Sequence, residues 1–182
     1  MTTGSRGVNT MKPGILFVTV LSCVLCGTLF SNPGVLSAAG GALECQKQIA
    51  SAVVHSTAVG LGGILKNVEN ETDRISIIRD FIDQIRFYPD QSGYFYVYDF
   101  DCVNIAHATQ KDLPGKNLRD YKDVKGKYVI RELAAAAEKG GGFVEYYWVR
   151  PGFKGEHLKI GYVEPIPDTP YFIGTGVYLE GQ

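Results

Sequence analysis

The stretch GYFYVYDFDCVNIAHAT at residues 93–109 decides how the rest of the chain is arranged. Three of its aromatic residues occupy alternate positions, which a β-strand would place on one face: Tyr94, Tyr96 and Tyr98. A turn-like segment follows at residues 99–101, and a second apolar run then ends at His107. The pattern predicts a β-hairpin that carries aromatic hydroxyls and an imidazole on a shared surface. Such a surface suits a small polar ligand better than a plain hydrophobic core.

The chain before this hairpin is predicted to form two helices between residues 42 and 84. Apolar side chains recur at helical spacing on both sides of a polar segment at residues 70–73, where Thr72 is the predicted cap of the second helix. A glycine-rich segment at residues 60–63 argues against one straight first helix, because each glycine costs about 1 kcal/mol in a helix interior.

A third helix and three further strands are predicted after the hairpin. The sequence YVIRELAAAAEK at residues 128–139 is strongly helical and is stopped by three glycines. Three runs with strand-like patterns follow it, at residues 143–149, 158–163 and 171–179. In the first of these runs Val144, Tyr146 and Trp148 share one face. The order of elements predicts an α+β domain that has a five-stranded antiparallel sheet with helices on one side.

The first 39 residues have the features of a secretory signal or a membrane anchor. Basic residues precede an uncharged apolar run at residues 14–30, and a patch of small residues follows. Ser37 and Ala39 suit the −3 and −1 positions of a cleavage site after Ala39. The apolar run is also close to the roughly 17–25 residues that span a bilayer, so an uncleaved anchor stays open. Both alternatives predict export, either free in the periplasm or anchored to the inner membrane.

Four cysteines are present, and two of them, Cys23 and Cys26, lie inside the apolar run. Their C-x-x-C spacing is not a haem attachment signal, because no histidine follows it. Removal of a signal segment would leave Cys45 and Cys102. In an exported protein these two can form a disulfide, and the alternative is that both are small buried thiols. The sequence leaves both alternatives open.

Composition and motifs argue against nucleic-acid binding and against catalysis. The 182 residues carry a formal net charge of −1, and no basic patch stands out. The sequence lacks the local motifs of serine hydrolases, zinc peptidases and phosphate-binding loops. Its three histidines, His55, His107 and His157, are too widely spaced to predict a metal site. We therefore expect no enzyme activity, no metal and no cofactor.

Six short segments of the chain form an ordered set of motifs. They are GYFYVYD at 93–99, IAH at 105–107, LPGKNL at 113–118, GFVEYYW at 142–148 with a Pro-Gly pair shortly after, KIGYV at 159–163, and IGTGVY at 173–178. Their sequences and their order resemble those of single Cache domains, the extracytoplasmic PAS-like sensor modules of bacterial chemoreceptors and histidine kinases. Ala108 departs from the family, which usually has proline after the histidine. The predicted organisation is a signal peptide or anchor at residues 1–39 and a single Cache domain at residues 43–182.

The resemblance implies a short-chain carboxylate ligand, such as acetate, propionate or pyruvate, held on one face of the sheet. A buried carboxylate needs a cation and several hydrogen-bond donors, since its desolvation otherwise outweighs its contacts. The ligand-binding residues that the resemblance implies are Tyr96, Tyr98, His107, Tyr146, Trp148 and, as the cation, Lys159. Arg150 stands at a strand end before the Pro-Gly pair and is predicted to be a surface charge.

Two functions are expected from these observations. The first is an exported, stand-alone sensor module that binds a small organic acid and acts through a separate membrane receptor or kinase. This expectation rests on the motif set and on the lack of an output domain in the sequence. The alternative is an interaction or structural module in which the protein's own tyrosines fill the pocket. A homodimer is a further expectation, although no heptad pattern requires one.

Overall fold

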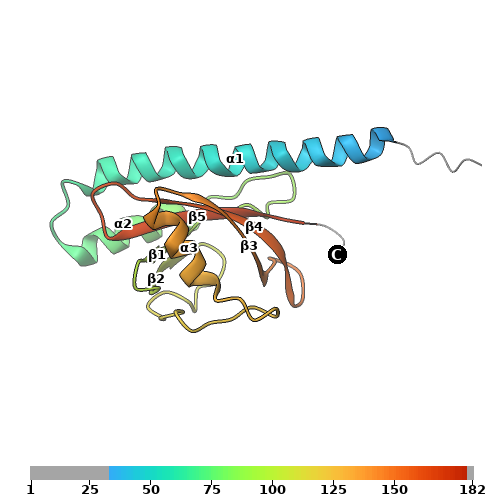
Figure 1. Cartoon of the computed structure of the whole chain (residues 1–182). Helices are drawn as coiled ribbons and strands as arrows, with labels where there is room; N and C mark the ends of the chain where they lie inside the picture. Colours follow the sequence, from blue (N-terminus) through green and yellow to red (C-terminus); the bar gives the residue numbers. More distant parts are fainter. Residues whose placement is uncertain (1–32, 180–182) are drawn as a thin grey trace, which may run out of the picture. The chain divides into compact units, whose positions relative to one another are not determined.

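The α+β fold expected from the sequence is confirmed by a computed structural model, which describes residues 33–179, with side chains from residue 40 onwards. Its elements in chain order are α1 (Pro33–Leu65), α2 (Glu71–Asp83), β1 (Tyr96–Asp99), β2 (Asn104–His107), α3 (Val129–Glu138), β3 (Gly142–Val149), β4 (Glu156–Pro165) and β5 (Tyr171–Tyr178). Figure 1 shows the long α1 along one side of the sheet and the shorter α3 on the other.

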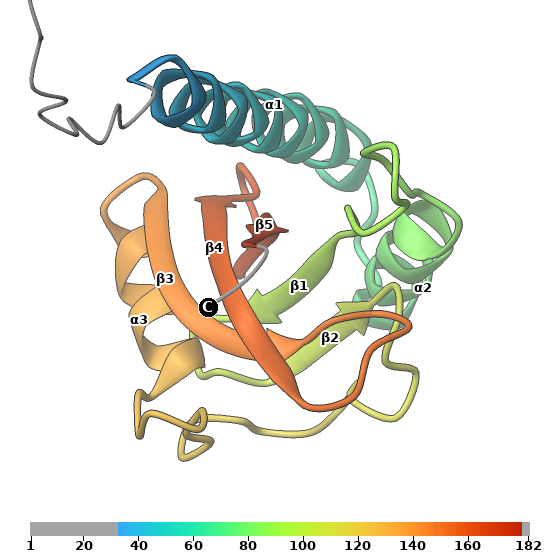
Figure 2. The same ribbon diagram turned by 90° about the vertical axis from the view of Figure 1, so that its right-hand side faces the viewer.

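The five strands form one antiparallel sheet in the order β2-β1-β5-β4-β3. Every residue of β5 is buried, so both faces of the sheet centre are covered. α1 runs over one face, α3 packs against β3 and β4 on the other, and α2 lies against β2 (Figure 2). The prediction of helices on one side was therefore wrong, because a strand that is apolar on both faces requires a layer on each.

The register of the strands brings distant residues onto the face that α3 covers. Tyr96 of β1 lies opposite His107 of β2. Lys159 of β4 lies opposite Tyr146 of β3 and Tyr178 of β5. Residues directly opposite each other point to the same face of a sheet, and the pairing through β5 places all five on one face. The surface that the hairpin sequence predicted is thus present, and β3, β4 and β5 extend it.

α1 is continuous through the glycine-rich segment at residues 60–63, where the sequence argued for an interruption. Val54, Leu61 and Leu65 of this helix are fully buried in the core. Their packing outweighs the low helix propensity of glycine, because tertiary contacts supply most of the stability of a helix in a protein. Within the described residues, Gly40–Leu65 also has the length and hydropathy of a membrane-spanning helix, but its buried side chains belong to the domain core.

α2 is capped by Asn70 and not by Thr72, as the sequence had suggested. Asn70 Oδ1 accepts hydrogen bonds from the backbone N–H groups of Thr72 at 2.8 Å and Asp73 at 3.2 Å. The backbone of Asn70 is extended (φ −77°, ψ 124°), as an N-cap requires. Asparagine and threonine are both good caps, so the choice between two close neighbours depended on the turn that ends α1.

Replacing Gly63 with alanine is expected to raise the free energy of unfolding by about 0.5–1 kcal/mol, because the helix interior gains a better helix former. A Cβ at Gly63 meets no atom within 4 Å, whereas a Cβ at Gly62 lies 3.0 Å from the carbonyl oxygen of Pro167. Gly62→Ala is therefore the matched control, and it is expected to gain less or to destabilise. Chemical denaturation followed by circular dichroism measures both. Equal stabilisation by the two variants would contradict the packing of α1 against Pro167.

Two predictions for the N-terminal part of the chain have different outcomes. The apolar run at residues 14–30 and the pair Cys23 and Cys26 lie outside the described residues, so a signal peptide or anchor stays a prediction. Cys45 and Cys102 are both free thiols, the first exposed on α1 and the second buried in the β1–β2 turn. The disulfide alternative was therefore wrong, because the turn directs the Cys102 thiol into the core. The thiol alternative holds for Cys102 but not for Cys45, which is exposed.

Candidate functional site

A narrow cavity, of about 180 Å³ including the open solvent at its mouth, lies between the sheet face and α3. Its lining comes from β1, β2, α3 and β3, and consists of Tyr96, Tyr98, His107, Val129, Ile130, Leu133, Tyr146 and Trp148. Five of the six residues that the sequence implied as ligand-binding therefore line one cavity, and Lys159 does not. The three residues from α3 are an addition that sequence reasoning missed. The sequence signal that could have found them is the apolar stripe of α3, but such a stripe is equally typical of a helix that packs in an ordinary hydrophobic core.

Glycines make room for the large side chains that form the sheet side of the cavity. A Cβ added at Gly174 would lie 2.7 Å from the ring of Tyr96 and 2.6 Å from Val163. A Cβ added at Gly161 would lie 2.9 Å from the hydroxyl oxygen of Tyr146. The tyrosine rings can therefore lie close to the sheet only because these two positions have no side chain.

The hydroxyl groups on the sheet side are buried and neutral. Tyr96 Oη and Tyr146 Oη lie 3.1 Å apart and share a hydrogen bond. Tyr98 Oη is buried and forms no hydrogen bond with any described residue. Burial raises the pKa of all three tyrosines above its ordinary value, so each keeps its proton at neutral pH. A buried hydroxyl without a partner is uncommon, and a ligand in the cavity could supply one.

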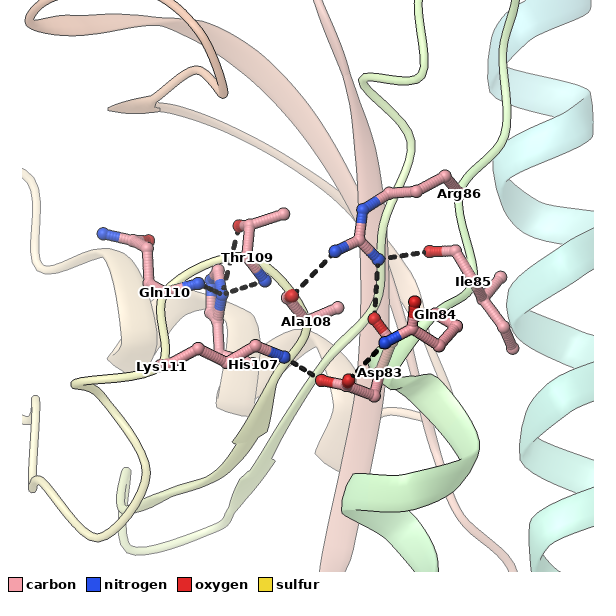
Figure 3. A network of polar contacts seen from close by, with 9 residues as sticks. All are labelled: Asp83, Gln84, Ile85, Arg86, His107, Ala108, Thr109, Gln110 and Lys111. Carbon is pink, nitrogen blue, oxygen red and sulfur yellow. Dashed lines mark hydrogen bonds and ion pairs between the residues drawn. The ribbon is translucent and has the colours of Figure 1, made fainter.

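His107 is a neutral imidazole whose hydrogen bonds fix its tautomer. Its Nδ1 accepts a hydrogen bond from the backbone N–H of Gln110 at 3.0 Å, with the N–H of Thr109 at 3.4 Å (Figure 3). Nε2 therefore carries the proton and is the donor left for the cavity. Burial, together with the positive charge of Lys159, lowers the pKa of His107 to about 3. The residue is 4% exposed.

The free energy of unfolding of the ligand-free domain is expected to rise with pH between about 3 and 6.5. In this window the unfolded chain binds a proton at His107 and the folded domain does not, because the folded pKa is about 3 and the ordinary value is 6.5. His107→Gln should remove up to about 5 kcal/mol of this dependence. Urea titrations at several pH values measure it, with His157→Gln, at a half-buried histidine outside the cavity, as the control. An unchanged slope in His107→Gln would contradict the depressed pKa.

Lys159 lies behind the cavity, enclosed by tyrosines. The side chain is 1% exposed, and its Nζ donates a hydrogen bond to Tyr94 Oη at 3.0 Å. Nζ also lies 4.1 Å, 5.3 Å and 4.8 Å from the ring centroids of Tyr94, Tyr96 and Tyr178. Burial alone lowers its pKa well below the ordinary lysine value, and Lys159 forms no ion pair with any described carboxylate. It is the buried cation nearest to the tyrosine wall, with Tyr96 between its amine and the cavity.

A chain of hydrogen bonds connects Lys159 to the end of β3. Tyr178 Oη donates to the carbonyl oxygen of Val149 at 2.7 Å, and it lies 3.0 Å from Tyr94 Oη. Because the Tyr178 proton is used in this way, Tyr94 must donate to Tyr178 while it accepts from Lys159. Tyr94 and Tyr178 therefore hold the amine in place. Sequence reasoning named both tyrosines but did not include them in the site.

Two predicted roles change in the structure. Trp148 was expected to donate to the ligand, but its Nε1 donates to Gln110 Oε1 at 2.7 Å, so the indole serves as a wall. Arg150 was expected to be a surface charge, and this was wrong. It is 8% exposed, its Nη2 donates to Asp90 Oδ2 at 3.0 Å, and its guanidinium stacks 4.4 Å over the ring of Phe153. The stacking and the ion pair explain the burial of a charged side chain.

This geometry is that of a ligand-sensing domain: a PAS-like α+β scaffold with one small cavity of aromatic walls and a few buried polar groups. Residues 45–181 match the Cache domain family, and the chain belongs to that family. Cache domains are extracytoplasmic sensor domains, found in chemoreceptors and in histidine kinases. The family expected from the sequence is thereby confirmed.

Several known proteins are similar to this chain. The sensor histidine kinase MctS of Rhizobium johnstonii is 40% identical over 90 residues, which cover 50% of this chain and 20% of the kinase. The methyl-accepting chemotaxis protein McpP of Pseudomonas putida is 29% identical over 92 residues, covering 50% of this chain and 17% of that protein. The chain thus matches only about a fifth of the length of these curated relatives.

Solved structures of sensor domains match more of the fold. A methyl-accepting chemotaxis protein from Vibrio parahaemolyticus has a TM-score of 0.70 and 28% identity, covering 81% of this chain and 97% of that one. A second structure, described as the structural basis for carboxylic acid recognition by a Cache chemosensory domain, has a TM-score of 0.61 and 25% identity. It covers 82% of this chain and 99% of that one.

Proposed function

We propose that this Cache domain binds a short-chain monocarboxylate in the cavity beside Tyr96 and His107. The observation that carries the proposal is a set of neutral polar groups at a cavity backed by the buried amine of Lys159. They are the Nε2–H of His107 and the paired hydroxyls of Tyr96 and Tyr146, which use one of their two protons in the hydrogen bond between them. A carboxylate would accept hydrogen bonds from these groups and gain from the nearby positive charge. A similar structure is described as recognising carboxylic acids, which supports the same ligand class.

The two sides of the cavity differ in polarity, and this favours an acid with one charged end. The sheet side carries the hydroxyls and the imidazole, whereas Val129, Ile130 and Leu133 of α3 supply only apolar groups. A second carboxylate in the ligand would face the apolar wall and lose its hydration without compensation. Acetate, propionate and pyruvate fit this arrangement, and dicarboxylates do not.

A thermal-shift titration of the purified protein tests the proposal. Acetate, propionate, butyrate and pyruvate are compared with succinate at equal concentration and ionic strength. At a ligand concentration 100-fold above Kd, a true ligand should raise Tm by about 5–10 °C. Stabilisation by at least one monocarboxylate but not by succinate is the expected result. Failure of every monocarboxylate to shift Tm in a correctly folded protein would refute the proposal.

The proposal extends to location and signalling. The relatives are a sensor histidine kinase and a methyl-accepting chemotaxis protein, so we infer that the domain acts outside the cytoplasm and passes its signal to a membrane receptor or kinase. Export by residues 1–39 is part of the same proposal, as is formation of a homodimer. Fractionation of cells that express the tagged full chain tests the location, and a cytoplasmic protein would contradict it.

The alternative function is an interaction module that binds no small ligand. One observation favours it: the Lys159 amine is already enclosed by three tyrosine rings and a hydroxyl oxygen of the protein itself. The thermal-shift titration separates the two functions, because an interaction module would be stabilised by its partner and by none of the acids.

A further inference from the structure

A second hollow shares His107 with the cavity but opens to solvent. This cleft, of about 860 Å³ including its mouth, lies between α2 and the chain that follows β2, and its lining includes Arg79, Asp83, Ala106, Lys111 and Pro114. His107 is the one described residue that lines both the cavity and the cleft. Its buried imidazole therefore forms part of the partition between them.

The segment at residues 108–111, called the strap below, holds His107 in this position. The strap donates backbone N–H groups to His107 Nδ1, including that of Gln110 at 3.0 Å (Figure 3). The Gln110 side chain also accepts the Trp148 Nε1–H at 2.7 Å on the cavity side. If the strap moves outward, His107 Nδ1 loses the N–H groups that donate to it, and the Trp148 Nε1–H loses its acceptor. The ring orientation of His107 is thus coupled to the position of the strap.

The strap is fastened to α2 by polar contacts at the surface. Lys111 forms an ion pair with Asp83, the last residue of α2 (Figure 3). Arg86 Nη2 donates to the carbonyl oxygen of Ala108 at 2.8 Å. Both Lys111 and Asp83 are substantially solvent-accessible, so their ion pair contributes only about 0.2–1 kcal/mol. Because these contacts are weak, they favour the closed position of the strap but allow it to open.

We propose that the cleft is the entrance to the cavity, and that the strap and the His107 imidazole together form its gate. The inference rests on the proposed function only for the identity of the ligand that passes. Opening requires release of the Lys111–Asp83 ion pair and rotation of the imidazole away from the partition. The gate controls how fast a carboxylate enters and leaves. The affinity for the carboxylate is set by the closed, ligand-bound state.

The first test needs no ligand and uses diethyl pyrocarbonate, which modifies neutral imidazoles, with peptide mass spectrometry as the readout. His55 is exposed and His157 is half-buried, and both serve as internal references. In Asp83→Asn, modification of His107 should become about two- to fivefold faster, because the ion pair no longer favours the closed strap. The two reference rates should not change. Lys116→Met is the matched control, since it breaks an exposed ion pair with Asp112 that does not hold the strap.

A locked protein completes this test. Asp83→Cys and Lys111→Cys, in a background in which Cys23, Cys26 and Cys45 are replaced by serine, are joined by a short bis-methanethiosulfonate linker that reductant removes. His107 should be modified more slowly in the linked protein than in the same protein after reduction. If neither the lock nor Asp83→Asn changes the His107 rate, the partition does not open at the strap and the inference is overturned.

The second test measures propionate exchange by the fluorescence of Trp148, the single tryptophan of the chain, which lies in the cavity wall. Stopped-flow mixing should show association and dissociation rate constants that rise together in Asp83→Asn and fall together in the linked protein, with Kd nearly constant. A change in only one of the two rate constants, and hence a change in Kd, would also count against a gate. If propionate and the other acids bind no variant, the proposed function fails while the histidine result stands by itself.

Discussion

A Lys159→Met variant is expected to be more stable than the parent protein and to bind its carboxylate about 10- to 100-fold more weakly. The stability gain follows from the surroundings of the amine, which is 1% exposed and has a tyrosine hydroxyl as its hydrogen-bond acceptor. Burial of an amine without an ion pair costs free energy whether the group stays charged or loses its proton, so replacing it by an apolar group of similar volume is neutral or stabilising by about 1–4 kcal/mol. Methionine keeps the length of the side chain between the tyrosine rings.

The loss of binding follows from the position of the amine behind Tyr96. Its charge acts on the cavity across the tyrosine ring, whose centroid is 5.3 Å away. At about 7 Å and an effective dielectric constant of about 20, a unit charge contributes about 2 kcal/mol to the binding of a carboxylate. Isothermal titration with the acid found by thermal shift measures the affinity, and thermal unfolding measures the stability.

The matched control for this variant is Lys122→Met. Lys122 also places its ammonium over a tyrosine ring, at 4.5 Å from the centroid of Tyr128, but it is exposed to solvent. We expect no gain in stability and no change in affinity. A Lys159→Met variant that binds as tightly as the parent would remove Lys159 from the site.

The affinity for a carboxylate is expected to fall as pH rises. Burial lowers the pKa of Lys159 well below its ordinary value, so above that pKa the amine of the free domain is neutral. An anionic ligand favours the charged amine, and binding must then take up a proton, which costs up to about tenfold in Kd per pH unit. Titrations in buffers of different ionisation enthalpy count the protons. Lys159→Met should abolish the dependence, and a parent affinity that rises with pH would contradict it.

The sequence brought five of the predicted residues to one cavity wall because strand alternation has a short period. Tyr96, Tyr98, Tyr146 and Trp148 were placed on common faces by counting in twos, and a register that pairs Tyr96 with His107 brought them together. Side-chain direction in a strand depends on local geometry alone, so this part of the prediction needed no knowledge of the tertiary structure.

Features that depend on contacts between distant elements could not be predicted in the same way. The burial of Arg150 depends on Asp90 and Phe153. Asp90 is remote in the sequence, and Phe153 lies in a turn whose shape the sequence does not predict. The enclosure of Lys159 depends on tyrosines from β1, from β5 and from the segment just before β1. The α3 wall depends on which face of the sheet that helix covers, and the wrong expectation of helices on one side hid this wall. Local sequence patterns therefore predicted the polar residues on the sheet side of the cavity but not the apolar residues of the α3 wall.

A Gly174→Ala variant is expected to lose about 1–3 kcal/mol of stability and to lose carboxylate binding. The added Cβ would lie 2.6 Å from Val163 Cγ1 and 2.7 Å from ring atoms of Tyr96. Both neighbours are buried, so Tyr96 must move off the sheet, toward the cavity that it lines. The shift also separates its hydroxyl from Tyr146 Oη. Urea denaturation and acid titration measure the two losses.

Two further variants show whether the loss comes from the tyrosine ring. Gly142→Ala is the control in the same sheet, because its Cβ meets no atom closer than 3.8 Å, and it should keep both stability and binding. The double variant Gly174→Ala/Tyr96→Leu removes the ring that the new methyl group strikes, so it should recover stability relative to Gly174→Ala but not binding. Recovery of binding in the double variant would show that the Tyr96 hydroxyl does not contact the ligand. A stable Gly174→Ala protein that binds normally would show that the sheet can adjust, and that close contact of Tyr96 with Gly174 is not what shapes the cavity.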